Sequence, residues 1–126
     1  MKEQTPLSRA HGLGAAHSGV HHFWVQRLTA VALVPLIIWF LVSLLGHAMG
    51  DYDSARAFLA QPLAAALLLL LIGAGFYHMK LGVQVVIEDY IHTESTKVAL
   101  LMLNTFCAIA VGLVCALAVL KLFVAG

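Results

Sequence analysis

The chain contains few charged side chains. Only 10% of its 126 residues are Asp, Glu, Lys or Arg, whereas soluble domains carry about 25%. The formal net charge is +1, and there is no basic stripe to neutralise the phosphates of a nucleic acid. Hydrophobic residues make up 62% of the chain, well above the roughly 45–50% of soluble domains. The composition therefore excludes an ordinary soluble domain, argues against a nucleic-acid partner and indicates a membrane protein.

Cysteine is also scarce. Cys107 and Cys115 are the only two cysteines, and both lie in the last apolar segment. Eight residues of helix place them about 12 Å apart, which is too far for a mutual disulfide. We interpret them as small residues that face lipid or a neighbouring helix.

Three long apolar runs dominate the rest of the sequence, at about 23–49, 62–88 and 97–124. Each run is long enough to cross a hydrocarbon core of about 30 Å as a helix. The sequence thus predicts an all-α membrane protein with three transmembrane helices.

Two parts of unequal length are expected. Residues 1–22 form a polar, Gly/Ala-rich tail that is not a signal peptide and is expected to lie on the membrane surface or against a soluble partner. Residues 23–126 form the membrane domain, in which Pro35 is expected to kink the first span. Residues 50–61 predict a polar loop with at most one helical turn, and Pro62 suits the first turn of the second helix.

His78 lies inside the second span, at the start of the stretch HMKLGVQVVIEDYIH. About 15 Å of helix separate it from Glu88, so it is expected near the bilayer midplane. An ionisable side chain at that depth is costly unless it faces a bundle interior, and neutral imidazole is the usual ligand of haem iron. Gly82, on the same face, would leave room for a porphyrin ring. A histidine that simply bonds a neighbouring helix explains the pattern equally well.

The second span ends in a polar pair, Asp89 and Tyr90. The Tyr90 hydroxyl can donate to a quinone carbonyl, and Asp89 can orient it or relay protons. The alternative is an ordinary helix exit with an interfacial tyrosine. With three spans, Arg27 lies at the same membrane face as this pair, where it can snorkel or bind an anion. Lys80 is expected to snorkel or to approach an acidic group.

Two segments, SGVHHFWVQRLTA and HMKLGVQVVIEDYIH, carry a family resemblance. Together with three spans in a chain of this length, they resemble the smaller hydrophobic membrane anchor of bacterial succinate dehydrogenase. The specific features are the spacing H-x(11)-Y with Asp before the Tyr, and the upstream elements S-G-x-H and R-x-T-A. The resemblance covers nearly the whole chain.

The resemblance implies roles for individual residues. His78 matches one axial ligand of haem b, with the second ligand on the larger cytochrome b anchor. Tyr90 matches the tyrosine that hydrogen-bonds a quinone carbonyl, and Asp89 the acidic residue beside it. No residue of this chain is expected to be catalytic by itself.

Two further positions, one just before the first span and one within it, match the family. Arg27 corresponds to an arginine near the haem propionates and the quinone pocket, and His21 to a histidine near those propionates. The position after His21 is acidic in relatives, whereas here it is His22. This departure leaves the local charge and the proton path open.

The function implied is that of an anchor subunit, not an enzyme by itself, in the heteromeric helical bundle of respiratory complex II. Such a chain docks the iron–sulfur and flavoprotein subunits to the membrane and forms part of the ubiquinone site. The positive-inside rule predicts a cytoplasmic N-terminus and 88–97 loop and a periplasmic C-terminus, in the bacterial inner membrane.

Three other functions remain open from the sequence. A small transporter or ion-pathway subunit would use His78, Lys80 and Glu88 as a proton path. A structural assembly factor would tolerate the loss of His78. A fumarate reductase anchor shares the architecture and can lack haem, although the position of His78 favours a haem-containing member.

Overall fold

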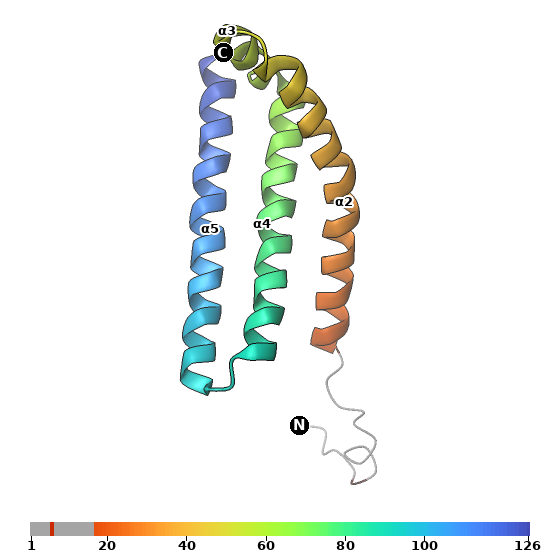
Figure 1. The fold of residues 1–126 in the computed structure, drawn as a ribbon, viewed down its shortest axis with the longest axis vertical. Helices are drawn as coiled ribbons and strands as arrows, with labels where there is room; N and C mark the ends of the chain where they lie inside the picture. The colour runs from red at the N-terminus through yellow and green to blue at the C-terminus, as the bar shows by residue number, and fades with distance from the viewer. Residues whose placement is uncertain (1–5, 7–16) are drawn as a thin grey trace.

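The computed structural model describes residue 6 and residues 17–126. Within this part of the chain the elements are α2 (His17–Ala48), α3 (Tyr52–Leu59), α4 (Pro62–Tyr90) and α5 (Glu94–Ala125). The three long helices run alongside one another with α4 in the middle, and α3 covers one end (Figure 1). Among these residues α4 packs against both long neighbours, while α2 and α5 do not touch. The predicted all-α class is confirmed.

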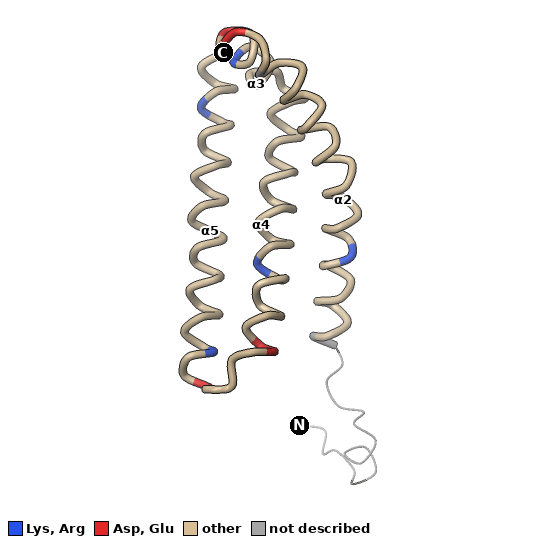
Figure 2. Tube along the Cα trace, in the orientation of Figure 1, with Lys and Arg blue, Asp and Glu red and all other residues tan. Residues whose placement is uncertain are grey.

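The three long helices match the predicted number of spans. Gly19–His47 of α2, and the whole of α4 and α5, are long and apolar enough to cross a membrane. Charged residues gather near the ends of the bundle, with one basic position part way along α2 and another along α4 (Figure 2). An apolar middle flanked by charged ends is the distribution expected for spanning helices.

The first long helix begins before the predicted start of its span. Residues 1–5 and 7–16 of the predicted tail lie outside the described residues, whereas residues 17–22 are already helical in α2. A helix satisfies its own backbone hydrogen bonds, so it can extend beyond the hydrocarbon core into the interface. Pro35 lies inside α2, which continues through it and curves toward α3 (Figure 1).

The connection between the first two spans is more ordered than the sequence predicted. Instead of at most one turn it forms the eight-residue α3. Asp51 caps this helix, because its Oδ1 accepts a hydrogen bond of 3.1 Å from the backbone N–H of Ser54. Phe58 then stacks on His47, with ring centroids 4.1 Å apart, and lies 6.3 Å from the ring of Trp39. These contacts dock α3 onto the end of α2.

The other two helices begin close to where their sequence signals lie. Pro62 occupies the first turn of α4, as predicted. Thr93 precedes the first turn of α5 at the N-cap position, but its side chain makes no capping hydrogen bond. The backbone carbonyl of Thr93 accepts a hydrogen bond of 2.9 Å from the N–H of Lys97.

One buried apolar cluster lies near the α3 end of the bundle, and further buried apolar residues are spread along the helices: Leu33, Leu81, Ile87 and Ala108. Ala65, Leu68 and Val119 form a buried cluster between α4 and α5. Partly buried side chains pack around this cluster: Trp39, Phe40, Leu59, Leu69, Leu71 and Ile72. Small residues at the α4 contact allow the helices to approach closely. Cys107 and Cys115 are both free, as predicted.

Candidate functional site

His78 lies close to the middle of α4, since position 76 is the midpoint of that helix. Its side chain is half-buried, and its Nδ1 is 3.0 Å from the hydroxyl oxygen of Thr29 on α2. This contact joins the two helices. One ring nitrogen of the histidine is therefore held by the neighbouring helix, and the other stays available for a second interaction.

The space next to this histidine on α4 is open. A side chain built at Gly82, one turn further along and on the same face, would meet no atom within 4 Å in the described part of the chain. The open position is compatible with a flat group lying against the helix beside His78.

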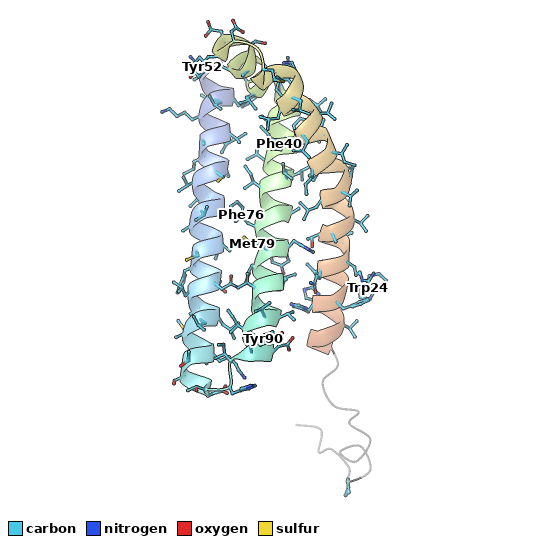
Figure 3. All side chains as sticks on the ribbon, in the orientation of Figure 1. Trp24, Phe40, Tyr52, Phe76, Met79 and Tyr90 are labelled. Atoms are coloured by element: carbon cyan, nitrogen blue, oxygen red, sulfur yellow. The ribbon has the colours of Figure 1, made fainter. Side chains whose placement is uncertain are left out.

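Asp89 and Tyr90 are the last two residues of α4. Both side chains are exposed, and 76% of the Tyr90 surface is accessible. Tyr90 lies at the same end of the bundle as Trp24 of α2 (Figure 3). The predicted pair thus stands at a helix exit with its polar atoms free to meet a ligand or a partner chain.

Arg27 and His21 are both exposed on α2. The guanidinium carbon of Arg27 lies 5.1 Å from the ring centroid of Phe23, a cation–π distance. Arg27 precedes Thr29 by two residues, which corresponds to about 200° around the helix. Because Thr29 faces α4, Arg27 points away from His78, and the structure does not bring these two predicted residues together.

His22, whose role the sequence left open, faces α4. It borders a recess of about 280 Å³ that is also lined by Gly19, Gln84, Val85 and Glu88. The Nε2 of His22 is buried and has no hydrogen-bond partner within the described residues. Across the recess, Gln84 Nε2 donates to Glu88 Oε1 at 2.9 Å. Polar groups thus gather between α2 and α4 at the Tyr90 end.

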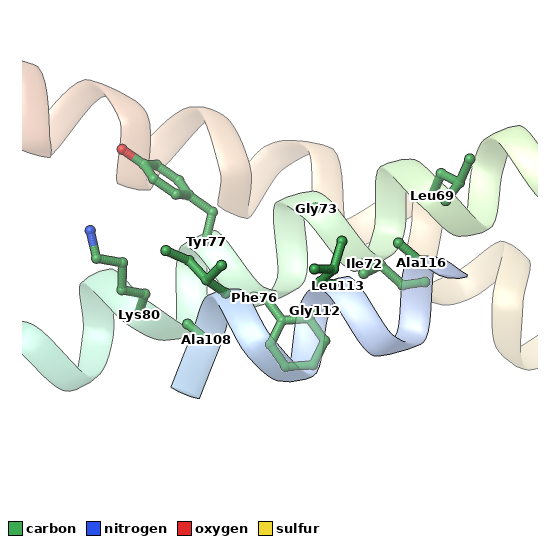
Figure 4. Close-up of a pocket in the computed structure, with 11 residues that line it drawn as sticks. Leu69, Ile72, Gly73, Phe76, Tyr77, Lys80, Ala108, Gly112, Leu113 and Ala116 are labelled. Carbon is green, nitrogen blue, oxygen red and sulfur yellow. The ribbon is translucent and has the colours of Figure 1, made fainter. Parts of the chain in front are cut away.

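A larger apolar groove of about 370 Å³ runs between α4 and α5 (Figure 4). Lys80 lines it and carries its Nζ 5.8 Å from the ring centroid of Tyr77. Asn104 of α5 donates to the backbone carbonyl of Lys80 at 2.9 Å. His78 and the other predicted site residues do not line this groove.

Sequence reasoning missed two of the polar contacts between helices. Thr29 belongs to the R-x-T-A element, which supplied a family resemblance but no role for the threonine. Asn104 is the one Asn in an otherwise apolar run, and that isolation was the available signal. Both residues bond α4, at His78 and Lys80 respectively.

The fold and these polar contacts define a class, that of small helical membrane proteins whose three spans carry polar groups between the helices. The family model described as "Succinate dehydrogenase/Fumarate reductase transmembrane subunit" matches residues 1–119. The chain belongs to this family.

Curated relatives agree with that assignment. A succinate dehydrogenase hydrophobic membrane anchor subunit of Rickettsia bellii (strain RML369-C) is 35% identical over 96 residues, which cover 76% of this chain and 77% of the relative. The protein of the same name from Paracoccus denitrificans is 32% identical over 102 residues, covering 80% and 78%. A succinate dehydrogenase membrane anchor subunit of Reclinomonas americana is 29% identical over 97 residues, covering 75% and 81%. With three apolar helices, this chain is a multi-pass membrane protein.

Proposed function

We propose that this chain is the smaller membrane anchor of a succinate:quinone oxidoreductase, supplying one axial ligand of haem b and part of the ubiquinone site. Family membership and the names of the curated relatives support the anchor role. The chain carries no flavin or succinate chemistry of its own in this proposal. Its partners are the larger cytochrome b anchor, the iron–sulfur subunit and the flavoprotein subunit.

The observation that carries the haem proposal is the half-buried position of His78 and its contact with Thr29. An imidazole that binds haem iron within a bundle keeps one nitrogen free for iron, while a neighbour orients the other. His78 meets these requirements through its half-buried place near the middle of α4 and its contact with Thr29. The open position at Gly82 fits a porphyrin edge. When bound, haem b would supply one-electron transfer.

The quinone site is proposed at the end of α4. Tyr90 presents an exposed hydroxyl that can donate to a quinone carbonyl, and Asp89 beside it can orient the hydroxyl or pass on a proton. Quinone reduction consumes two protons, and the recess lined by His22 and Glu88 gathers polar groups near this end. Arg27 and His21, both exposed on α2, are proposed to meet the haem propionates.

The proposed orientation follows from the charges. Arg27 and Lys97 lie toward the Tyr90 end, against Arg56 and Lys121 toward the α3 end. Because Lys2, Arg9 and the N-terminus precede α2, the positive-inside rule favours a cytoplasmic Tyr90 end. A bacterial inner-membrane chain in this orientation presents its proposed quinone site to the soluble subunits.

The test is a reduced-minus-oxidised optical spectrum of the complex purified through a tag on this chain, with succinate as one reductant. His78→Leu is compared with His47→Leu, a matched change at the other end of the bundle, where the histidine stacks on Phe58. We expect large flavin-bearing subunits in every preparation, a b-type signal in the parent and in His47→Leu, and its loss in His78→Leu.

Each part of the proposal can fail separately. Flavin subunits without a b-type signal in the parent would leave the anchor role standing and remove the haem role. A parent-like signal in His78→Leu would remove this residue as the ligand. If neither haem nor flavin subunits co-purify, the anchor proposal is wrong, and proton transport through His78, Lys80 and Glu88 becomes the function to measure.

A further inference from the structure

The hydroxyl of Thr29 makes three close polar contacts. Its oxygen lies 2.8 Å from the carbonyl oxygen of Val25 and 3.0 Å from that of Gln26, both on its own helix. The third contact, of 3.0 Å, is with Nδ1 of His78 on α4. A threonine hydroxyl has a single proton to donate and two lone pairs to accept with.

The two carbonyl contacts indicate which atom donates in the contact between Thr29 and His78. A carbonyl oxygen can only accept a hydrogen bond, so the contacts with Val25 and Gln26 are made only if the hydroxyl proton points at them. The lone pairs of the hydroxyl oxygen then remain for the contact with His78, and in this arrangement Nδ1 of the histidine carries the proton. In the opposite arrangement the hydroxyl would donate to Nδ1 and both carbonyl contacts would lose their proton.

We infer that Thr29 is the positioning residue for the proposed iron ligand: it accepts the Nδ1–H of His78 and so leaves the unprotonated Nε2 to bind haem iron. This inference rests on the haem role proposed above. A neutral imidazole has one protonated nitrogen, so fixing the proton on Nδ1 frees the lone pair on Nε2. The same bond fixes the rotation of the ring about the side chain. Partners of this kind are what orient metal-bound histidines in general.

The geometry of α2 holds the Thr29 hydroxyl in place to accept from His78. The two carbonyls that take its proton lie three and four residues earlier on α2, so the hydroxyl is held by its own helix before it meets α4. The oxygen is thereby preoriented, and the side chains of both partners are at least partly buried. A β-branched side chain also restricts rotation at the first torsion angle.

The experiment compares five forms of the whole complex: the parent, Thr29→Val, Thr29→Ser, Thr29→Ala and Thr105→Val. Thr29→Val keeps the shape and removes the hydroxyl, while Ser and Ala at this position differ from each other only by the hydroxyl oxygen. Thr105→Val is the matched control, because within the described residues the Thr105 hydroxyl bonds only the carbonyl of Leu101, on its own helix, and no histidine. Should Thr29→Val not assemble, the Ser and Ala variants alone make the comparison.

Two readouts are independent of turnover: the rate of haem transfer to apomyoglobin and the midpoint potential of the b-type signal. Loss of a partner behind a metal ligand typically weakens metal affinity about 10- to 100-fold, so we expect haem transfer at least tenfold faster in Thr29→Val and Thr29→Ala. Their midpoint potential should rise, because the imidazole without its acceptor donates less charge to iron. Thr29→Ser and Thr105→Val should stay close to the parent.

The outcomes separate this inference from the proposal on which it rests. If Thr29→Val and Thr29→Ala keep the parental transfer rate and potential while His78→Leu loses the b-type signal, His78 is the ligand and Thr29 does not position it. If Thr29→Ser behaves like Thr29→Ala, the hydroxyl is not the group that matters and the inference is also wrong. If His78→Leu keeps the parental signal, the ligand proposal and this inference fall together.

Discussion

The α3 end and the Tyr90 end of the bundle are held together in different ways. Near α3, the buried cluster of Ala65, Leu68 and Val119 and the stacked rings of His47 and Phe58 make apolar contacts. From the middle of α4 toward the Tyr90 end, buried apolar side chains such as Leu81 and Ile87 are accompanied by two polar contacts between helices, Thr29 with His78 and Asn104 with the backbone of Lys80.

The packed α3 end serves as a scaffold, whereas the proposed site lies toward the Tyr90 end. In a lipid environment close packing and interhelical hydrogen bonds drive helix association, because lipid tails are as apolar as leucine. The α3 end uses the first of these, and the other half of the bundle uses both. The Tyr90 end places polar groups inside a membrane bundle, which is costly unless they serve a function. Substitutions at the two ends should therefore change different observables.

The largest expected effect is on quinone reduction. Tyr90→Phe removes a hydroxyl that we propose donates to a quinone carbonyl, so succinate:quinone reductase activity should fall roughly 10- to 100-fold, as expected when a catalytic hydrogen bond is lost. Steady-state assays with a short-chain ubiquinone, on membranes of matched haem content, measure this change. The b-type spectrum should be unchanged.

The matched control for that variant lies at the opposite end. Tyr52 on α3 is 74% exposed, almost the same as the 76% of Tyr90. Tyr52→Phe should keep parental activity, because the α3 end has no proposed ligand. Equal losses of quinone reductase activity in Tyr90→Phe and Tyr52→Phe would show that exposed tyrosines matter only for general assembly. The two ends of the bundle would then not differ in function.

A second prediction concerns the packed end. Leu68, with 8% of its surface accessible, belongs to the buried cluster, whereas Leu70 on the same helix is 60% exposed. Leu68→Ala should lower the free energy of unfolding by about 2 kcal/mol, the low end of the usual range because the transfer term is small in lipid. Thermal denaturation of the detergent-solubilised complex measures this loss.

Leu70→Ala is the control, and it should denature close to the parental temperature. In both variants the fraction that remains folded should keep parental quinone kinetics and haem. A loss of haem in Leu68→Ala below its denaturation temperature would mean that the packed end also shapes the site.

The sequence predicted the architecture better than the site, for a physical reason. The number of spans, the helix start at Pro62 and the free cysteines follow from length, apolarity and local geometry, which are properties of neighbouring residues. The short helix α3 is longer than the single turn predicted, because Asp51 caps a helix within a segment whose polar composition is typical of a loop.

The contacts of the site depend on how helices face each other, and a single sequence does not specify that. Thr29 and His78 are 49 positions apart, and nothing in their spacing indicates that they meet. The direction of Arg27 likewise depends on the rotation of α2, which turns Thr29 rather than Arg27 toward α4. Residues were therefore identified by type and family position, while their pairing required the structure.

The smallest predicted effect concerns the hydrogen bond between Asn104 of α5 and the backbone of Lys80 on α4. Asn104→Leu removes the hydrogen bond from α5 to the backbone carbonyl of Lys80. Hydrogen bonds between membrane helices contribute about 0.6 kcal/mol on average, so the denaturation midpoint should fall only slightly, less than in Leu68→Ala. Thr105→Val, which loses a bond within its own helix, serves as the reference. If Asn104→Leu destabilised the complex more than Leu68→Ala, the polar end would contribute more to assembly than the packed core, and the division into scaffold and site would have to be reversed.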